Sequence, residues 1–82
     1  MITIENLFRQ EVLKTIKDWD ARAKLMNSED FDSPKHYKAW LDDIRISKKI
    51  NIGNLCWCYK RIGVTEDVTR KVIAELKEGG LL

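Results

Sequence analysis

The chain has 82 residues, which suits a single hydrophobic core, and its 44% apolar and 34% charged residues are typical of a folded globular domain. A net charge of +2 is too small to indicate, by itself, a nucleic acid or a membrane surface as partner. No apolar run approaches the ~18 residues of a membrane span, and the first residues lack the pattern of a signal peptide. We therefore expect a cytoplasmic protein without membrane contact.

The first segment predicts a long helix over residues 4–26, with Thr3 as its N-cap. Apolar side chains recur there at steps of three and four residues, which places them on one helical face. These residues are Phe8, Val12, Ile16, Trp19, Ala23 and Met26.

A polar and acidic stretch, residues 27–33, predicts a loop before a second helix over 34–46. Ser33 suits the N-cap of that helix, and Pro34 suits its first position. An inward apolar stripe follows, made of Tyr37, Trp40, Leu41 and Ile44. Residues 47–52 alternate in polarity too briefly to decide between a short strand and the lead-in to a helix, and we expect them to be extended, with one very short strand over 48–52.

Two more helices are predicted, over residues 53–62 and 65–78, separated by a tight turn at Gly63. Thr65 suits the N-cap of the last helix, and Gly79 and Gly80 end it. Its buried side is expected to carry Val68, Val72, Ile73 and Leu76. The expected fold is therefore all-α, a small four-helix domain formed by residues 1–82.

Residues 34–82 resemble the helix-turn-helix of winged-helix transcription regulators. The resemblance rests on the turn Gly63-Val64-Thr65, on the apolar positions of the last helix, and on the closing residues Gly80-Leu81-Leu82. It implies a regulatory protein whose last helix enters the major groove of double-stranded DNA. On this hypothesis the long first helix serves dimerisation, because a dimer on two half-sites doubles the small interface of one copy. The residues expected to contact DNA are Thr65, Arg70, Lys71 and Lys77 on that helix, with Lys48, Lys49, Lys60 and Arg61 on phosphates.

The alternative hypothesis is a small protein-binding module, an inhibitor or adaptor of a larger partner such as those of phages and mobile elements. The near-neutral net charge favours it, as do the acidic Glu66 and Asp67 at the start of the expected recognition helix. Its expected interface contains Trp57, the charged face of the first helix, and the acidic loop residues Glu29, Asp30 and Asp32.

No pattern of a catalytic, cofactor or metal site is found. Cys56, Cys58 and His36 supply three possible ligands, whereas structural zinc sites use four. Residues two apart on a helix also point about 200° apart, which separates the two thiols. We expect free thiols, no cofactor and no enzymatic activity.

Overall fold

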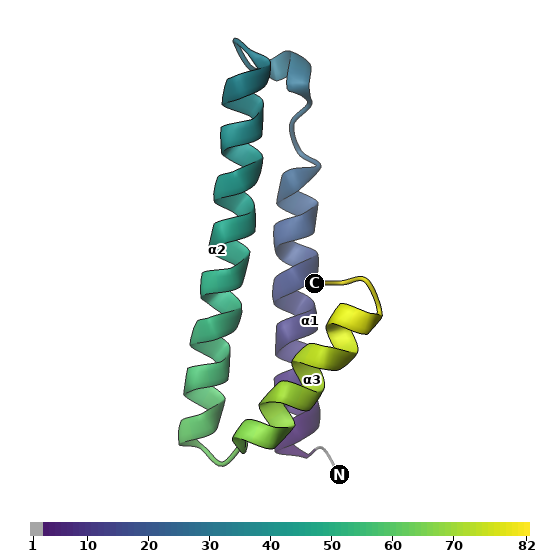
Figure 1. Ribbon diagram of the computed structural model, residues 1–82, viewed down its shortest axis with the longest axis vertical. Coiled ribbons are helices and arrows are strands. Elements are labelled where there is room, and N and C mark those ends of the chain that lie inside the picture. The colour runs from purple at the N-terminus through teal and green to yellow at the C-terminus, as the bar shows by residue number, and fades with distance from the viewer. Residues whose placement is uncertain (1–2) are drawn as a thin grey trace.

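The computed structural model describes residues 3–82, which form three α-helices and one short 3-10 helix (Figure 1). The elements are α1 (Ile4–Ala23), η1 (Ser28–Asp30), α2 (Pro34–Arg61) and α3 (Glu66–Glu78). α1 and α2 form a long antiparallel hairpin, and α3 packs across its lower end in Figure 1, so that the molecule measures 48 × 20 × 19 Å. The prediction of an all-α fold is confirmed for the described residues, but they contain three α-helices rather than four.

Three of the four predicted helix starts are confirmed in detail, whereas no helix starts at residue 53. Thr3, Ser33 and Thr65 are the N-caps of α1, α2 and α3, and each hydroxyl accepts a hydrogen bond from the backbone N–H three residues later, at 3.2 to 3.3 Å. Pro34 occupies the first turn of α2, where its missing N–H leaves no donor unsatisfied.

The predicted break and short strand at residues 48–52 are wrong, because α2 continues through them without interruption. The inward stripe of α2 runs on past Ile44, and Lys48 occupies the next position on it. Its side chain is only 19% exposed, and its ammonium group lies 3.2 Å from Asp20 Oδ1 of α1. Ile52, one turn further, is buried in the core. Because a lysine interrupts the apolar pattern, the pattern alone did not indicate that residues 34–61 form a single continuous helix.

The predicted end of the first helix is also too late, since α1 ends at Ala23. Leu25 and Met26 follow it in the loop and are 79% and 37% exposed, so Met26 does not join the buried stripe. The loop itself is as predicted, with η1 as one short turn inside it.

The hydrophobic core lies at one end of the hairpin, where all three helices meet. Its residues are Phe8, Val12, Ile16, Ile52, Tyr59, Val64, Val72 and Leu76. The rings of Phe8 and Tyr59 lie 5.2 Å apart between α1 and α2. At the other end of the hairpin the side chains are only partly buried, and an aromatic cluster of Phe31, Tyr37 and Trp40 joins the loop to α2.

The predicted tight turn at Gly63 is present between α2 and α3. Gly63 has φ of +120°, a value that residues with a side chain rarely adopt, and the N–H of Val64 bonds to the carbonyl of Tyr59 at 2.9 Å. At the end of α3, Gly80 has φ of +74° and the N–H of Leu81 returns to the carbonyl of Leu76 at 2.9 Å. Both glycines therefore fix the direction in which the chain leaves a helix.

Candidate functional site

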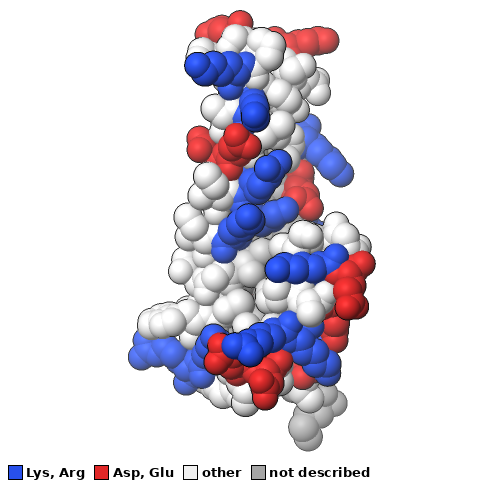
Figure 2. Space-filling view, viewed as in Figure 1, with Lys and Arg blue, Asp and Glu red and all other residues white. Residues whose placement is uncertain are grey.

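A cationic groove lies between the middle of α2 and the end of α3, with a volume of about 550 Å³. Three of its residues, Lys48, Lys49 and Lys77, were predicted to contact DNA. Its full lining consists of Arg45, Lys48, Lys49, Ile52, Ile73, Lys77 and Leu82. Figure 2 shows the basic side chains that gather over this part of the surface. Sequence reasoning did not place Arg45 in a site, nor the apolar residues of the groove.

The electrostatics of the groove are one-sided, because four lining residues are basic and none is acidic. Lys48 is held by Asp20, and Arg45 makes a longer contact of 3.9 Å with Asp42. Within residues 3–82, no carboxylate lies within ion-pair distance of Lys49 or Lys77. The groove therefore presents positive charge beside an apolar surface.

The outer face of α3, predicted to read DNA, carries cations that are already paired with acids. Arg70 is 75% exposed, as expected, but its guanidinium lies 3.3 Å from Glu66 Oε1. Lys71 Nζ lies 4.0 Å from Glu5 Oε2 of α1. Thr65 uses its hydroxyl to cap the helix and Lys77 faces the groove, so the predicted DNA-contacting residues of α3 do not form one free surface.

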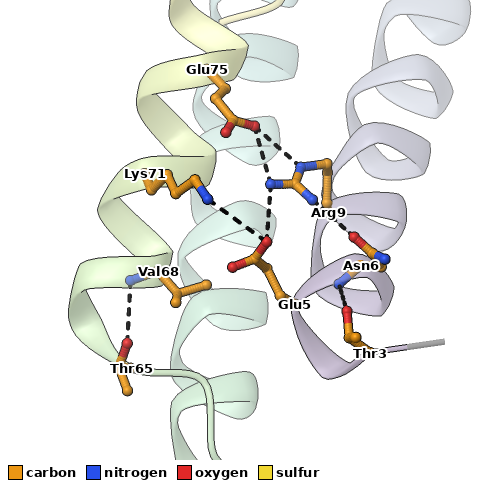
Figure 3. Close-up of polar contacts among 8 residues, drawn as sticks. All are labelled: Thr3, Glu5, Asn6, Arg9, Thr65, Val68, Lys71 and Glu75. Atoms are coloured by element: carbon orange, nitrogen blue, oxygen red, sulfur yellow. Dashed lines mark hydrogen bonds and ion pairs between the residues drawn. The ribbon is translucent and has the colours of Figure 1, made fainter. Parts of the chain in front are cut away.

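The ion pair of Lys71 belongs to a network that fastens α3 to α1 (Figure 3). Arg9 is at its centre and contacts Glu5 at 3.4 Å and Glu75 at 3.2 Å, while it also donates to the side chain of Asn6 at 3.0 Å. The charges of this network are satisfied within the chain. We therefore assign it to the docking of α3 rather than to ligand binding.

Trp57 is 60% exposed on the outer side of α2, near its C-terminal end. The Arg61 guanidinium lies 4.7 Å from the centre of its ring, an arrangement that holds the indole against the helix. The neighbouring Lys60 is also exposed. Trp57, Lys60 and Arg61 therefore form one surface. The sequence did not indicate it, because Trp57 was predicted for a protein interface and the two cations for contacts with DNA phosphates.

The acidic residues Glu29, Asp30 and Asp32 are all exposed and lie at the opposite end of the hairpin from α3 (Figure 1). Asp30 accepts a hydrogen bond from the N–H of Asn27 at 2.8 Å, which stabilises the loop. This loop is too far along the hairpin to share a compact binding surface with Trp57.

The two cysteines are unpaired, with Cys56 partly buried and Cys58 exposed. Burial raises the pKa of the Cys56 thiol, and the nearby Lys60 ammonium opposes that shift. Burial also raises the pKa of the Tyr59 hydroxyl, and the hydrogen-bonded Glu11 carboxylate acts in the same direction. In the described part of the chain, no three His, Cys, Asp or Glu side chains come together as a metal-binding group.

Comparisons with known proteins give no relative: no family model, curated protein or solved structure matches this chain. None of the helices described here combines the length and apolar character that crossing a membrane requires.

Proposed function

We propose that this chain is a protein-binding module, and that the groove between α2 and α3 takes an acidic, amphipathic segment of a larger partner. The observation that carries the proposal is the composition of the groove, with four basic and three apolar lining residues and no acid. An amphipathic helix or extended segment binds by its apolar side chains, while its charges select the partner.

The apolar residues argue for a peptide rather than for a phosphate backbone. Ile52, Ile73 and Leu82 offer nothing to a phosphate, whereas they match leucine-like side chains. Lys49 and Lys77 can then pair with carboxylates at the edges of the segment without breaking any ion pair within residues 3–82.

Double-stranded DNA is the competing partner, since α2, the turn at Gly63 and α3 are arranged in the order of a helix-turn-helix. Base reading by Arg70 would require it to leave Glu66. Asp67 also places negative charge at the start of α3, where phosphates would approach. These acids support the protein-binding proposal over the DNA-binding one.

A fluorescence titration separates the two partners. The probes are a dye-labelled helical peptide with leucines on one face flanked by glutamates, the same peptide with lysines for glutamates, and a dye-labelled random duplex. We expect binding of the acidic peptide alone. The double variant Arg45→Glu/Lys77→Glu should weaken it about tenfold, because two favourable charges become repulsive.

The matched control is Lys14→Glu/Lys38→Glu, which makes the same change of net charge at exposed sites outside the groove. It should bind the acidic peptide as the wild type does. An equal loss of affinity for the acidic peptide in both double variants would show that only net charge matters, and it would reject the groove as the binding site. Tighter binding of the duplex than of the acidic peptide would reject the proposed function in favour of DNA.

A further inference from the structure

The side of α2 that faces away from α1 carries an unpartnered apolar stripe. Ile46, Ile50 and Trp57 are 55%, 58% and 60% exposed, and Gly53 lies between the last two. These four positions follow steps of four, three and four residues, the spacing of a helical seam that packs against another helix. The stripe lies on a different side of α2 from the groove, so it does not depend on the proposed function.

The two ends of this stripe carry opposite charges. Asp42 and Asp43 lie at its N-terminal end, and Lys60 and Arg61 lie at its C-terminal end. On the left edge of Figure 2, over α2, an acidic patch lies below a basic side chain in the upper part, and it gives way to uncharged atoms and then to basic atoms at the bottom. A surface of this kind is complementary to itself when it is turned end over end.

We propose that the stripe binds a second copy of this chain, with the two α2 helices antiparallel about a two-fold axis. The axis passes level with the midpoint between residues 51 and 52, because the following pairs are all symmetric about that point. They are Ile46 with Trp57, Ile50 with Gly53, and Asp43 with Lys60. A two-fold interface requires each contact to occur twice, and this one supplies two ion pairs and four apolar contacts.

The stripe is complementary to a second copy in shape as well as in charge, and Gly53 provides the complementary shape. A β-carbon placed there would have no heavy atom within 4 Å, so the position is open to solvent in the single chain. Glycine is unfavourable in a helix interior, yet here it leaves room for Ile50 of the second copy to approach the backbone. The bulky Ile50 and the bare Gly53 therefore complement each other across the axis.

Charge also decides between the second copy and other occupants. A parallel arrangement would set Asp42 and Asp43 against the same acids of the other copy, and the cations against the same cations. A uniformly acidic or basic helix would match one end of the stripe and be repelled at the other. Only a helix with the opposite order of charges satisfies both ends, and an antiparallel α2 is such a helix.

Sedimentation equilibrium at low salt, over a range of protein concentrations, tests the proposal. The apparent mass of the wild type should rise from 9.6 kDa towards twice that value. Asp43→Lys alone, and Lys60→Asp alone, should each weaken association at least ~10-fold, because each places like charges opposite one another twice. The combined variant Asp43→Lys/Lys60→Asp should associate again, since the exchanged charges are once more complementary.

Asp18→Lys, a charge reversal at an exposed site on α1, is the control and should leave association unchanged. Circular dichroism verifies that every variant keeps its helices. Ile50→Glu should also be monomeric, because it buries a carboxylate near the axis. A wild type that stays at 9.6 kDa at all concentrations would overturn the proposal, as would a swapped variant that remains as weak as the single reversals.

Discussion

Replacing Gly53 with alanine should stabilise the protein, and the sign of the effect tests the continuity of α2. Gly53 lies inside this 28-residue helix, its φ is not positive, and a β-carbon there meets nothing within 4 Å. The substitution therefore adds helix propensity without a clash, about 1 kcal/mol in favour of the folded state. For a domain of this size that gain corresponds to a rise in Tm of ~4–8 °C.

Urea denaturation followed at 222 nm measures the free energy of unfolding, with all variants in the Asp43→Lys background to minimise self-association. Gly63→Ala is the matched control, because its φ of +120° penalises any side chain, and it should lose ~1 kcal/mol or more. If Gly53→Ala were neutral or destabilising, Gly53 would not lie within a helix. That result would restore the broken α2 expected from the sequence and would refute the reasoning.

Three further predictions address other parts of the molecule. Iodoacetamide at pH 8 should alkylate Cys58 faster than Cys56, because burial raises the pKa of the Cys56 thiol and leaves less thiolate. Mass spectrometry on the two single Cys→Ser variants measures the two rates, and equal rates would contradict the prediction. Phe8→Ala should cost ~3–5 kcal/mol in urea denaturation, since the side chain is 0% exposed, and a loss below ~1 kcal/mol would show that the core is misplaced. Arg70→Ala should change the free energy of unfolding by less than ~0.5 kcal/mol, because its ion pair with Glu66 is exposed. The variant should also bind the acidic peptide as the wild type does, and a lower affinity for that peptide would place the outer face of α3 in the binding site.

The local features of the fold could be predicted because their causes are local. A hydroxyl at an N-cap satisfies a backbone donor three residues away, so Thr3, Ser33 and Thr65 determine where each helix starts. Gly63 and Gly80 permit the backbone geometry that directs the chain out of a helix. None of these effects depends on which other segment the helix packs against.

The continuity of α2 and the position of the groove could not be predicted, because both depend on contacts between distant segments. In the sequence, Lys48 marks the end of an amphipathic pattern. In the structure its ammonium group pairs with Asp20, 28 residues earlier, so that the lysine fits on the inward side of the helix. Lys77 and Arg45 belong to different helices, and only the angle at which α3 returns along α2 brings them together. The exposed stripe did leave a signal, since Ile46 and Ile50 are out of phase with the inward residues of α2.

Self-association and groove binding, if both occur, would act together through geometry. Each copy keeps its own groove on a side of α2 that the antiparallel contact leaves open, so a dimer presents two grooves related by the two-fold axis. A partner with two acidic segments could then engage both, and its second binding step would be intramolecular. Such a partner should bind the wild type more tightly than Asp43→Lys, which lacks the dimer contact but keeps every residue of the groove. A peptide with a single acidic segment should bind both proteins equally, and a preference of that peptide for the wild type would show that Asp43 acts on the groove itself.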